Sequence, residues 1–463
     1  MRIVLKFVAA FLVAVLGAVS FAGASASLPA QINVAVDYYR LPNGLRVVLS
    51  HDSSVPTSTI AMYYHIGFRL EPRNRTGFAH LFEHLMFQES TNLAKGEADK
   101  LVAGNGGVSN GSTRFDYTNY FQVVPSHVTE PVLWVEAERM RGLVLSESSM
   151  QNQKDVVKNE VRVNVVNRPY GAFPWLDLPE HANSNWYNAH NFYGEFADID
   201  AATLKDVRSF YDTYYVPSNA VLVVAGDFDS IAVRAQIERY FGALPTRPEP
   251  VRPDLSEPKQ GKERTATRTD ALAPRPALAF GYHLPERNTP EWYAFGLIDQ
   301  ILLQGEDSRL WRRLVQERGY TDSVEGGMNL IGNMFDYEGP MLWAASLIHD
   351  AGANDAAIMA DVDDVIAHLQ RDPVGPAELE RAITKIRSAL YDVAGSSTRF
   401  GLVDLLACFA LFDDDPARVN RLESEFRKVT PELLRSTARK YLVRGNRTRL
   451  ALLAGKPPAG AKP

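Results

Sequence analysis

The apolar and polar positions along the chain repeat one arrangement of strand-like and helix-like segments in each half. An Asn43-Gly44 pair precedes the first apolar run, which is typical of a tight turn in a β-hairpin. Apolar runs with strand character cover residues 41–50, 57–67, 220–228, 275–285 and 448–455. Helical apolar spacing follows the first strands in both halves. The mixture predicts an α+β fold of two homologous domains, each a mostly antiparallel sheet with helices packed on one face.

A proline-rich segment separates the two halves. Residues 245–258 carry five prolines and alternating charges, so they form neither a helix nor a central strand and stay extended. We therefore predict an N-terminal domain over 27–245, a linker over 246–264 and a C-terminal domain over 265–455. The tail at 456–463 is small and proline-rich, and we expect it to be disordered.

The beginning of the chain has the pattern of an export signal. A positive start at Arg2 and Lys6 precedes an apolar run to about Phe21, and Ala24-Ser25-Ala26 is a small-x-small cleavage pattern. We expect a signal peptide over 1–26 and a periplasmic or secreted mature protein without a stable membrane anchor. An uncleaved anchor is the alternative, although the apolar run is short for a span of about 20 residues.

The amino-acid composition excludes several classes of protein. The 463 residues are 46% hydrophobic and 22% charged, which is an ordinary globular balance and excludes wholesale disorder. The formal net charge of −6 comes without a long basic run, so nucleic acid is not expected as a partner. The single cysteine, Cys408, excludes an internal disulfide and a cysteine-rich metal site, and its apolar surroundings favour core packing.

The sharpest chemical feature is the segment His80-Leu81-Phe82-Glu83-His84. It lies in a stretch with helical spacing, whose start Thr76 is expected to cap. Positions i and i+4 share one helix face, so both imidazoles can reach one metal ion, and Glu83 borders that face. Two histidines suit zinc, and His-x-x-Glu-His is the inverted zinc-binding pattern. The alternative is a solvated helix face with no metal.

A catalytic zinc needs a third protein ligand. Residues 151–171 read as a helix that ends at the Asn167-Arg168-Pro169 breaker, and Glu160 lies in its middle. Glu160 is either that ligand or an exposed glutamate on a charged helix, and periodicity does not separate the two.

Taken together, these motifs resemble the pitrilysin family of zinc metallopeptidases, which includes insulin-degrading enzyme and the mitochondrial processing peptidase. The resemblance rests on HLFEH, a Gly-Gly-rich strand, QKDVVKNE, NRPYG, residues 210–229 and SRLWRRLVQERGY. It implies one Zn²⁺ per chain held by His80, His84 and Glu160, with Glu83 as the general base. Gln153 stands where the family often has a second glutamate.

The resemblance also implies how substrate is held. Residues 106–120 would include an edge strand that pairs with substrate backbone, with Asn110 near the scissile bond and Gly111 where alanine is more usual. Arg313 and Tyr320 resemble a pair that holds substrate and stabilises the oxyanion, with Arg312 as a rival for the arginine. No histidine lies on the WYAFGLIDQILL helix, so the second domain is expected to bind no zinc.

The expected function is that of a zinc endopeptidase acting on peptides and unfolded polypeptides in an enclosed chamber. In the long members of the family that this chain resembles, the Arg/Tyr pair comes from the last of four domains and faces the zinc domain. The resemblance therefore implies that a two-domain chain takes this wall from a second subunit, in which Arg313 and Tyr320 act on the partner's zinc, and we expect a homodimer or a heterodimer with a related subunit. One alternative is a catalytically silent structural or peptide-binding subunit of a heterodimeric peptidase. Another is a zinc hydrolase that does not cleave peptides.

Overall fold

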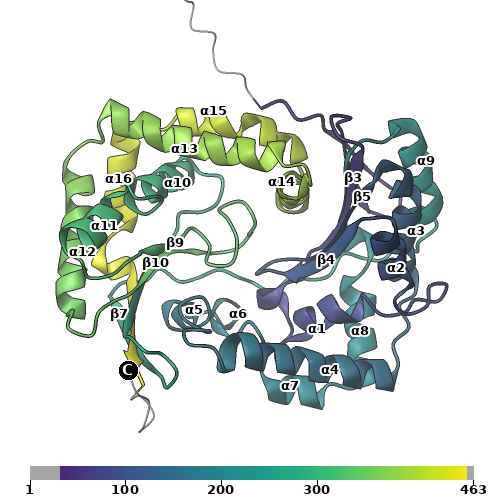
Figure 1. Cartoon of the computed structure of the whole chain (residues 1–463), viewed down its shortest axis with the longest axis horizontal. Helices are drawn as coiled ribbons and strands as arrows, with labels where there is room; N and C mark the ends of the chain where they lie inside the picture. Colours follow the sequence, from purple (N-terminus) through teal and green to yellow (C-terminus); the bar gives the residue numbers. More distant parts are fainter. Residues whose placement is uncertain (1–31, 456–463) are drawn as a thin grey trace, which may run out of the picture.

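The computed structural model describes residues 32–455, in which each half of the chain builds one β-sheet with helices around it (Figure 1). The expected signal peptide and the tail at 456–463 lie outside the described residues. Sheet 1 has the strand order β1-β2-β6-β3-β5-β4. Its strands are β1 (Asp37–Arg40), β2 (Arg46–His51), β3 (Thr57–Tyr64), β4 (Val108–Thr113), β5 (Thr118–Pro125) and β6 (Ala220–Gly226).

Sheet 2 repeats the topology of sheet 1 without β1. Its order β7-β11-β8-β10-β9 corresponds to β2-β6-β3-β5-β4, and in both sheets the first of these pairs is parallel and the others are antiparallel. The strands are β7 (Arg264–Asp270), β8 (Ala277–His283), β9 (Glu325–Gly327), β10 (Leu342–Ile348) and β11 (Arg447–Ala454). The prediction of two homologous, mostly antiparallel α+β domains is confirmed.

The helices fall into two sets by chain position. Those of the first half are α1 (Phe78–Leu85), α2 (Glu97–Gly104), α3 (Thr129–Arg141), α4 (Glu147–Val161), α5 (Asp177–Ala182), α6 (Trp186–Ala189), α7 (Phe196–Ala201), α8 (Leu204–Tyr214) and α9 (Ser230–Phe241). Those of the second half are α10 (Pro290–Leu302), α11 (Arg309–Trp311), α12 (Asp355–Arg371), α13 (Pro376–Gly395), α14 (Phe400–Phe412), α15 (Leu422–Arg427) and α16 (Pro431–Tyr441). One-turn π-helices at Arg162–Val166 and Arg312–Glu317 continue α4 and α11, and short 3₁₀ turns lie at Phe68–Leu70, Ser126–Val128, Pro217–Asn219, Pro416–Arg421 and Arg444–Asn446.

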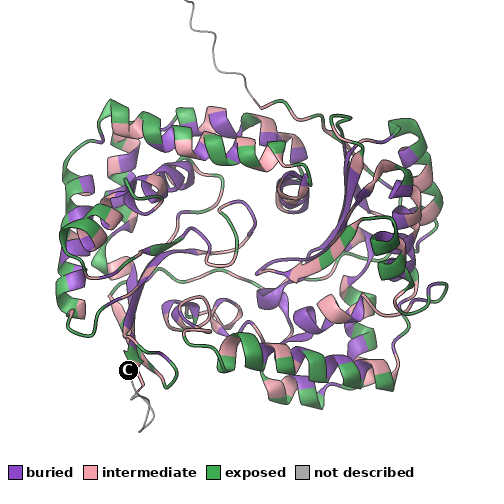
Figure 2. Ribbon diagram, viewed as in Figure 1, coloured by how far each residue is buried: buried purple, intermediate pink, exposed green. Residues whose placement is uncertain are grey.

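Sheet 1 is covered on both faces. Successive strand side chains point to opposite faces, so Ile60 and Met62 pack in the core of the first half while Ala61 and Tyr63 join the core of the second half. The cover on that second face is α14, which contacts β2, β3 and β6. Figure 2 accordingly shows sheet 1 buried along most of its length.

Helix α14 is buried almost throughout, and it brings one acidic side chain to the sheet. Asp404 accepts hydrogen bonds from the hydroxyls of Tyr63 and Tyr117, each at 2.9 Å. Cys408 is fully buried in the same helix and unpaired, as its apolar surroundings predict. Within residues 32–455, no single helix has the length and apolarity to cross a membrane; α13 and α14 meet that test only as a pair, which is bent by 105°.

Sheet 2 receives a helix from the first half in return. Leu178 and Ala182 of α5 pack with Ala279, Ala344 and Leu450 in a separate apolar cluster on sheet 2. The approach is close, because a Cβ atom at Gly281 would lie only 3.0 Å from Cδ2 of Leu178. Each half therefore packs its own helices on one face of its sheet, as predicted. In addition, α14 of the second half packs on sheet 1, and α5 of the first half packs on sheet 2.

The connection between the halves has no helix or strand from residue 245 to 263. It runs along the segment that follows α5. The amide nitrogen Nδ2 of Asn185 donates to the carbonyl of Asp254 at 2.8 Å, and Nδ2 of Asn188 donates to that of Leu255 at 2.8 Å. The proline-rich segment is extended, and side chains of the first half hold it in place.

Replacing Leu178 by alanine tests the contribution of α5 to sheet 2. Leu178 is fully buried, so Leu178→Ala should lower the free energy of unfolding by about 2–5 kcal/mol. Urea unfolding of the full chain measures this. Leu272→Ala is the control, because Leu272 is 49% exposed and its loss should change stability by less than about 0.5 kcal/mol. Equal stability of the two variants would contradict the packing role.

Candidate metal centre

Two histidines project from one face of α1. Phe78, Leu81, Phe82 and Leu85 are buried in the core of the first half, which fixes the rotation of the helix. His80 and His84 are one turn apart on the remaining face, and their ring centroids are 5.1 Å apart. His80 is buried and His84 is partly exposed.

Helix α4 brings Glu160 to the same point. Its Oε1 lies 3.6 Å from Nε2 of His80, and its Oε2 lies 3.2 Å from Nε2 of His84. One ligand atom from each of the three residues lies within 4.8 Å of the other two. The structure therefore brings together the three side chains that the resemblance implies.

The donor set fits a zinc ion. Two imidazole nitrogens and one carboxylate are ligands of catalytic zinc sites that keep an open position. The imidazole rings of His80 and His84 beside it hold the pKa of Glu160 well below its usual range. The geometry favours the metal-ligand interpretation of Glu160 over a solvated helix face.

The surroundings of His80 include a residue that the sequence analysis missed. The ring of Tyr193 packs against His80 with 5.1 Å between centroids, and burial raises the pKa of its hydroxyl. Nδ1 of His80 is buried and has no hydrogen-bond partner among the described residues. Gln153 is buried two turns before Glu160 on α4, and no hydrogen bond joins it to either histidine.

Glu83 lies between the histidine face and strand β4. Its Oε2 accepts a hydrogen bond from the Thr113 hydroxyl at 2.6 Å. A Cβ atom at Gly111 would lie 3.4 Å from Cγ of Glu83, so the strand backbone passes directly over this side chain. The contact holds the Glu83 carboxylate next to β4.

Strand β4 is the edge of sheet 1 and pairs with β5 alone among the strands of residues 32–455. Asn110 is exposed, and its side-chain oxygen accepts from the Gly111 N–H at 2.9 Å. The edge strand that the sequence analysis expects within 106–120 is therefore present, and it borders Glu83.

One sequence expectation is wrong at the start of α1. Thr76 does not cap the helix: the N-cap position is Gly77, with a φ of 84°, and the Thr76 hydroxyl donates to Asp198 at 2.6 Å. The carboxylate of Glu71 accepts instead from the N–H groups of Gly77 and Ala79. Thr76 is a residue type that often caps a helix, but its hydroxyl bonds to Asp198. The buried carboxylate of Glu71 accepts from the helix N–H groups in its place.

Arg313 and Tyr320 lie in the other half of the chain. Arg313 pairs with Asp364 at 2.7 Å, and the Tyr320 hydroxyl donates to Asp361 at 3.0 Å, both on α12. Arg312 is exposed. Figure 1 shows α11 and α12 far from α1 and α4, so one chain does not bring this pair to the metal centre.

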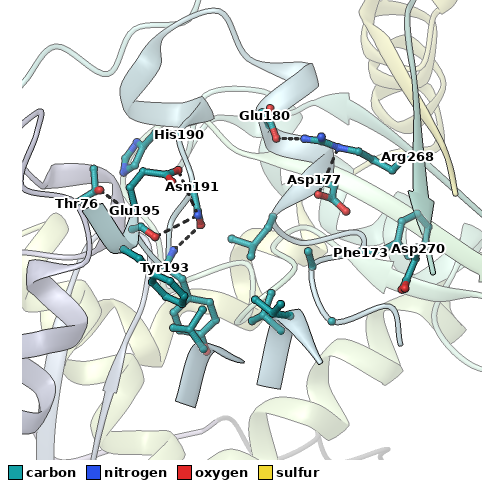
Figure 3. Close-up of a pocket in the computed structure, with 18 of the residues that line it drawn as sticks. Thr76, Phe173, Asp177, Glu180, His190, Asn191, Tyr193, Glu195, Arg268 and Asp270 are labelled. Carbon is teal, nitrogen blue, oxygen red and sulfur yellow. Dashed lines mark hydrogen bonds and ion pairs between the residues drawn. The ribbon is translucent and has the colours of Figure 1, made fainter. Parts of the chain in front are cut away.

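A cavity of about 1120 Å³ lies beside the cluster and is walled by both halves of the chain (Figure 3). Tyr193, which packs on His80, and Val161, which follows Glu160, form part of its wall. Phe173 and Arg268 also line it, with Asp270 at the end of β7. The cavity gives an extended ligand room next to the metal centre.

A helix with the His-x-x-Glu-His motif, joined by a glutamate from a second helix, is the arrangement of inverted-motif metallopeptidases. Comparison with known families agrees. Residues 46–173 match the family described as Insulinase (Peptidase family M16), and residues 201–386 match the Peptidase M16 inactive domain. The chain belongs to peptidase family M16.

Individual relatives support the assignment. The zinc protease PqqE of Helicobacter pylori is 29% identical over 352 residues, which are 74% of this chain and 76% of that protein. The crystal structure of a protease from Helicobacter pylori has a TM-score of 0.82 at 26% identity and covers 92% of this chain and 100% of that one. A peptidase M16 inactive domain from Pseudomonas fluorescens shares the fold, with a TM-score of 0.79 at 18% identity over 91% of this chain and 99% of that one.

The metal centre is testable by zinc binding. Glu160→Gln removes the anionic ligand and should weaken zinc affinity about 100-fold or more, because only two neutral imidazoles remain. Competition with a chromophoric chelator measures the dissociation constant. Glu147→Gln, on the exposed start of the same helix, is the matched control and should leave the measured zinc affinity unchanged. Unchanged affinity in Glu160→Gln would exclude Glu160 as a ligand.

Proposed function

We propose that this protein is a zinc endopeptidase that cleaves peptides and unfolded polypeptide segments held along β4. The observation that carries the proposal is the position of Glu83. Its carboxylate lies between the trio His80, His84 and Glu160 and the free edge of a β-sheet. A general base next to both a metal site and a peptide-binding edge is what hydrolysis of a peptide bond requires.

The chain's own residues account for the proton movements. Zinc held by the trio would act as a Lewis acid and would lower the pKa of water at the site to about 7. Glu83 takes the proton of the attacking water and delivers it to the nitrogen of the leaving amine. Thr113 orients the Glu83 carboxylate by donating to Oε2, so the other oxygen is available for this transfer.

Strand β4 explains how a substrate is held without a demanding sequence. An extended peptide that adds to the outer edge of β4 would form main-chain hydrogen bonds, as in β-augmentation. Asn110 is exposed on that edge, and Gly111 leaves space beside Glu83. Main-chain recognition accepts many sequences but requires an unfolded segment.

A second subunit would complete the site. Arg313 and Tyr320 are separated from the metal centre within one chain, so a partner copy or a related subunit would present them across an enclosed chamber. Their carboxylate partners on α12 fix both side chains before substrate arrives. We infer a dimer of this kind in a periplasmic or secreted setting.

The second candidate is a catalytically silent subunit. The match of residues 201–386 to a domain described as inactive keeps this candidate open. The active enzyme is favoured by the candidate ligands His80, His84 and Glu160 together with Glu83. A silent subunit requires neither three metal ligands nor a general base beside them.

Hydrolysis of a pool of unstructured peptides tests the proposal. The purified chain should cleave the pool, a zinc chelator should stop the cleavage, and zinc should restore it. Glu83→Gln should keep zinc and lose turnover by about 10²–10⁴-fold, because no group takes the proton. Glu97→Gln on α2 serves as the control and should cleave normally. A zinc-loaded chain that cleaves no peptide would favour the silent subunit.

Mixing two inactive variants tests the dimer. Glu83→Gln and Tyr320→Phe should each be nearly inactive alone. After unfolding and joint refolding, activity should return to about a quarter of normal, because half of the randomly paired dimers are mixed and each has one intact site. Failure to recover activity, or an active monomer in analytical ultracentrifugation, would refute action of Tyr320 on the partner's metal centre.

A further inference from the structure

The helix that carries His80, Glu83 and His84 starts without a cap of its own. Its N-cap position is Gly77, which has no side chain to accept a hydrogen bond. The first N–H groups of a helix have no partner within the helix, and buried ones need an acceptor from elsewhere. For α1 that acceptor is Glu71, a residue that precedes the helix and takes no direct part in metal binding.

Glu71 satisfies two of these groups at once. Its Oε2 accepts from the Gly77 N–H at 2.8 Å, and its Oε1 accepts from the Ala79 N–H at 2.6 Å. The side chain is fully buried, so its loss would leave two buried N–H groups without their acceptor. Burial raises the pKa of Glu71 to about 8, and the two N–H donors oppose that rise. Ala79 is the residue directly before His80.

The segment that carries Glu71 is tied to the end of the edge strand by two neighbouring residues. The Phe68 N–H donates to the carbonyl of Arg114, which follows β4, at 2.9 Å. The guanidinium of Arg69 pairs with both oxygens of buried Asp116 at 2.6 Å. Residues 68–71 therefore connect the end of β4 to the start of α1.

We propose that Glu71 is a positioning residue that fixes the start of α1, and thereby the approach of His80 and His84 to Glu160 and of Glu83 to β4. The inference rests on the proposed function only where kcat and KM are measured; the zinc-affinity measurement does not depend on peptidase activity. Helix α1 has eight residues and is about 12 Å long, so a shift at its start moves all three side chains. At the other end, Thr113 holds Glu83, and both ends are needed to fix the helix against β4.

The test compares Glu71→Gln with Glu97→Gln in the full chain. The glutamine side chain introduced at position 71 would keep the shape and one acceptor oxygen, but it would present an NH₂ group to the second N–H. Glu97 also accepts from a backbone N–H, that of Ala94 at 2.8 Å, at the start of α2, which carries no site residue. Zinc affinity by chelator competition, kcat, KM and the thermal midpoint of the metal-free protein are measured for each variant.

We expect Glu71→Gln to weaken zinc binding about 10–100-fold and to lower kcat with little change in KM, since the substrate edge is untouched. Glu97→Gln should leave zinc affinity and kcat unchanged. Leu178→Ala provides a destabilised variant with an intact α1, and it should keep normal zinc affinity. Visible spectra of the Co²⁺-loaded proteins should differ for Glu71→Gln and agree for the two controls.

Two results would overturn the proposal. One is a folded Glu71→Gln protein with normal zinc affinity and a normal Co²⁺ spectrum. The other is an equal loss of zinc affinity in Leu178→Ala, which would assign the effect to general instability. If no variant cleaves peptides, the proposed function fails, and the zinc affinities still decide the role of Glu71.

Discussion

Both sheets of this protein have two apolar faces, and the helices of each half cover only one of them. An apolar sheet face that is exposed to water lowers the stability of the fold. Each half therefore depends on a helix from the other half: α14 covers the second face of sheet 1, and α5 packs on sheet 2. This exchange explains why β6 is buried at every position and why α14 is apolar nearly all round. It also gives the two halves a shared apolar cluster, in which residues of sheet 1 pack with residues of α10 to α16.

The candidate metal centre also depends on contacts between the two halves. All of its candidate ligands come from the first half, but the loop before α1 is braced by the second half. Arg69 donates to the carbonyl of Pro340 at 2.6 Å, and the Glu338 N–H donates to Asp116 at 2.7 Å. The ion pair of Arg69 and Asp116 is buried on both sides, and breaking such a pair leaves an uncompensated charge. The second half thus acts on the site through the loop that carries Glu71, without contributing a ligand.

Local patterns were sufficient for much of the fold and for placing the two histidines on one helix face. The Asn43-Gly44 turn does join two antiparallel strands, because its φ requirement is local and glycine meets it. The i, i+4 spacing of His80 and His84 puts them on one face of any helix, whatever surrounds it. Glu160 was harder, since helical periodicity alone could not separate a ligand from a solvated glutamate, and the family resemblance supplied the choice.

Other features had no local signal. Strand β7 is polar nearly throughout, so the apolar pattern does not predict it. It forms because it pairs in parallel with β11 at the edge of sheet 2, where about half of its side chains remain exposed. Thr76 met the local rule for a cap, yet its hydroxyl was taken by Asp198. Glu71 and Tyr193 look like ordinary loop residues in the sequence, and only the folded chain places them against α1. The sequence by itself determined which side chains can bind a metal and move a proton, because those properties belong to residue type and helical spacing. The tertiary structure alone decided what holds them in place, because buried hydrogen bonds and ring contacts join residues whose separation along the chain carries no pattern.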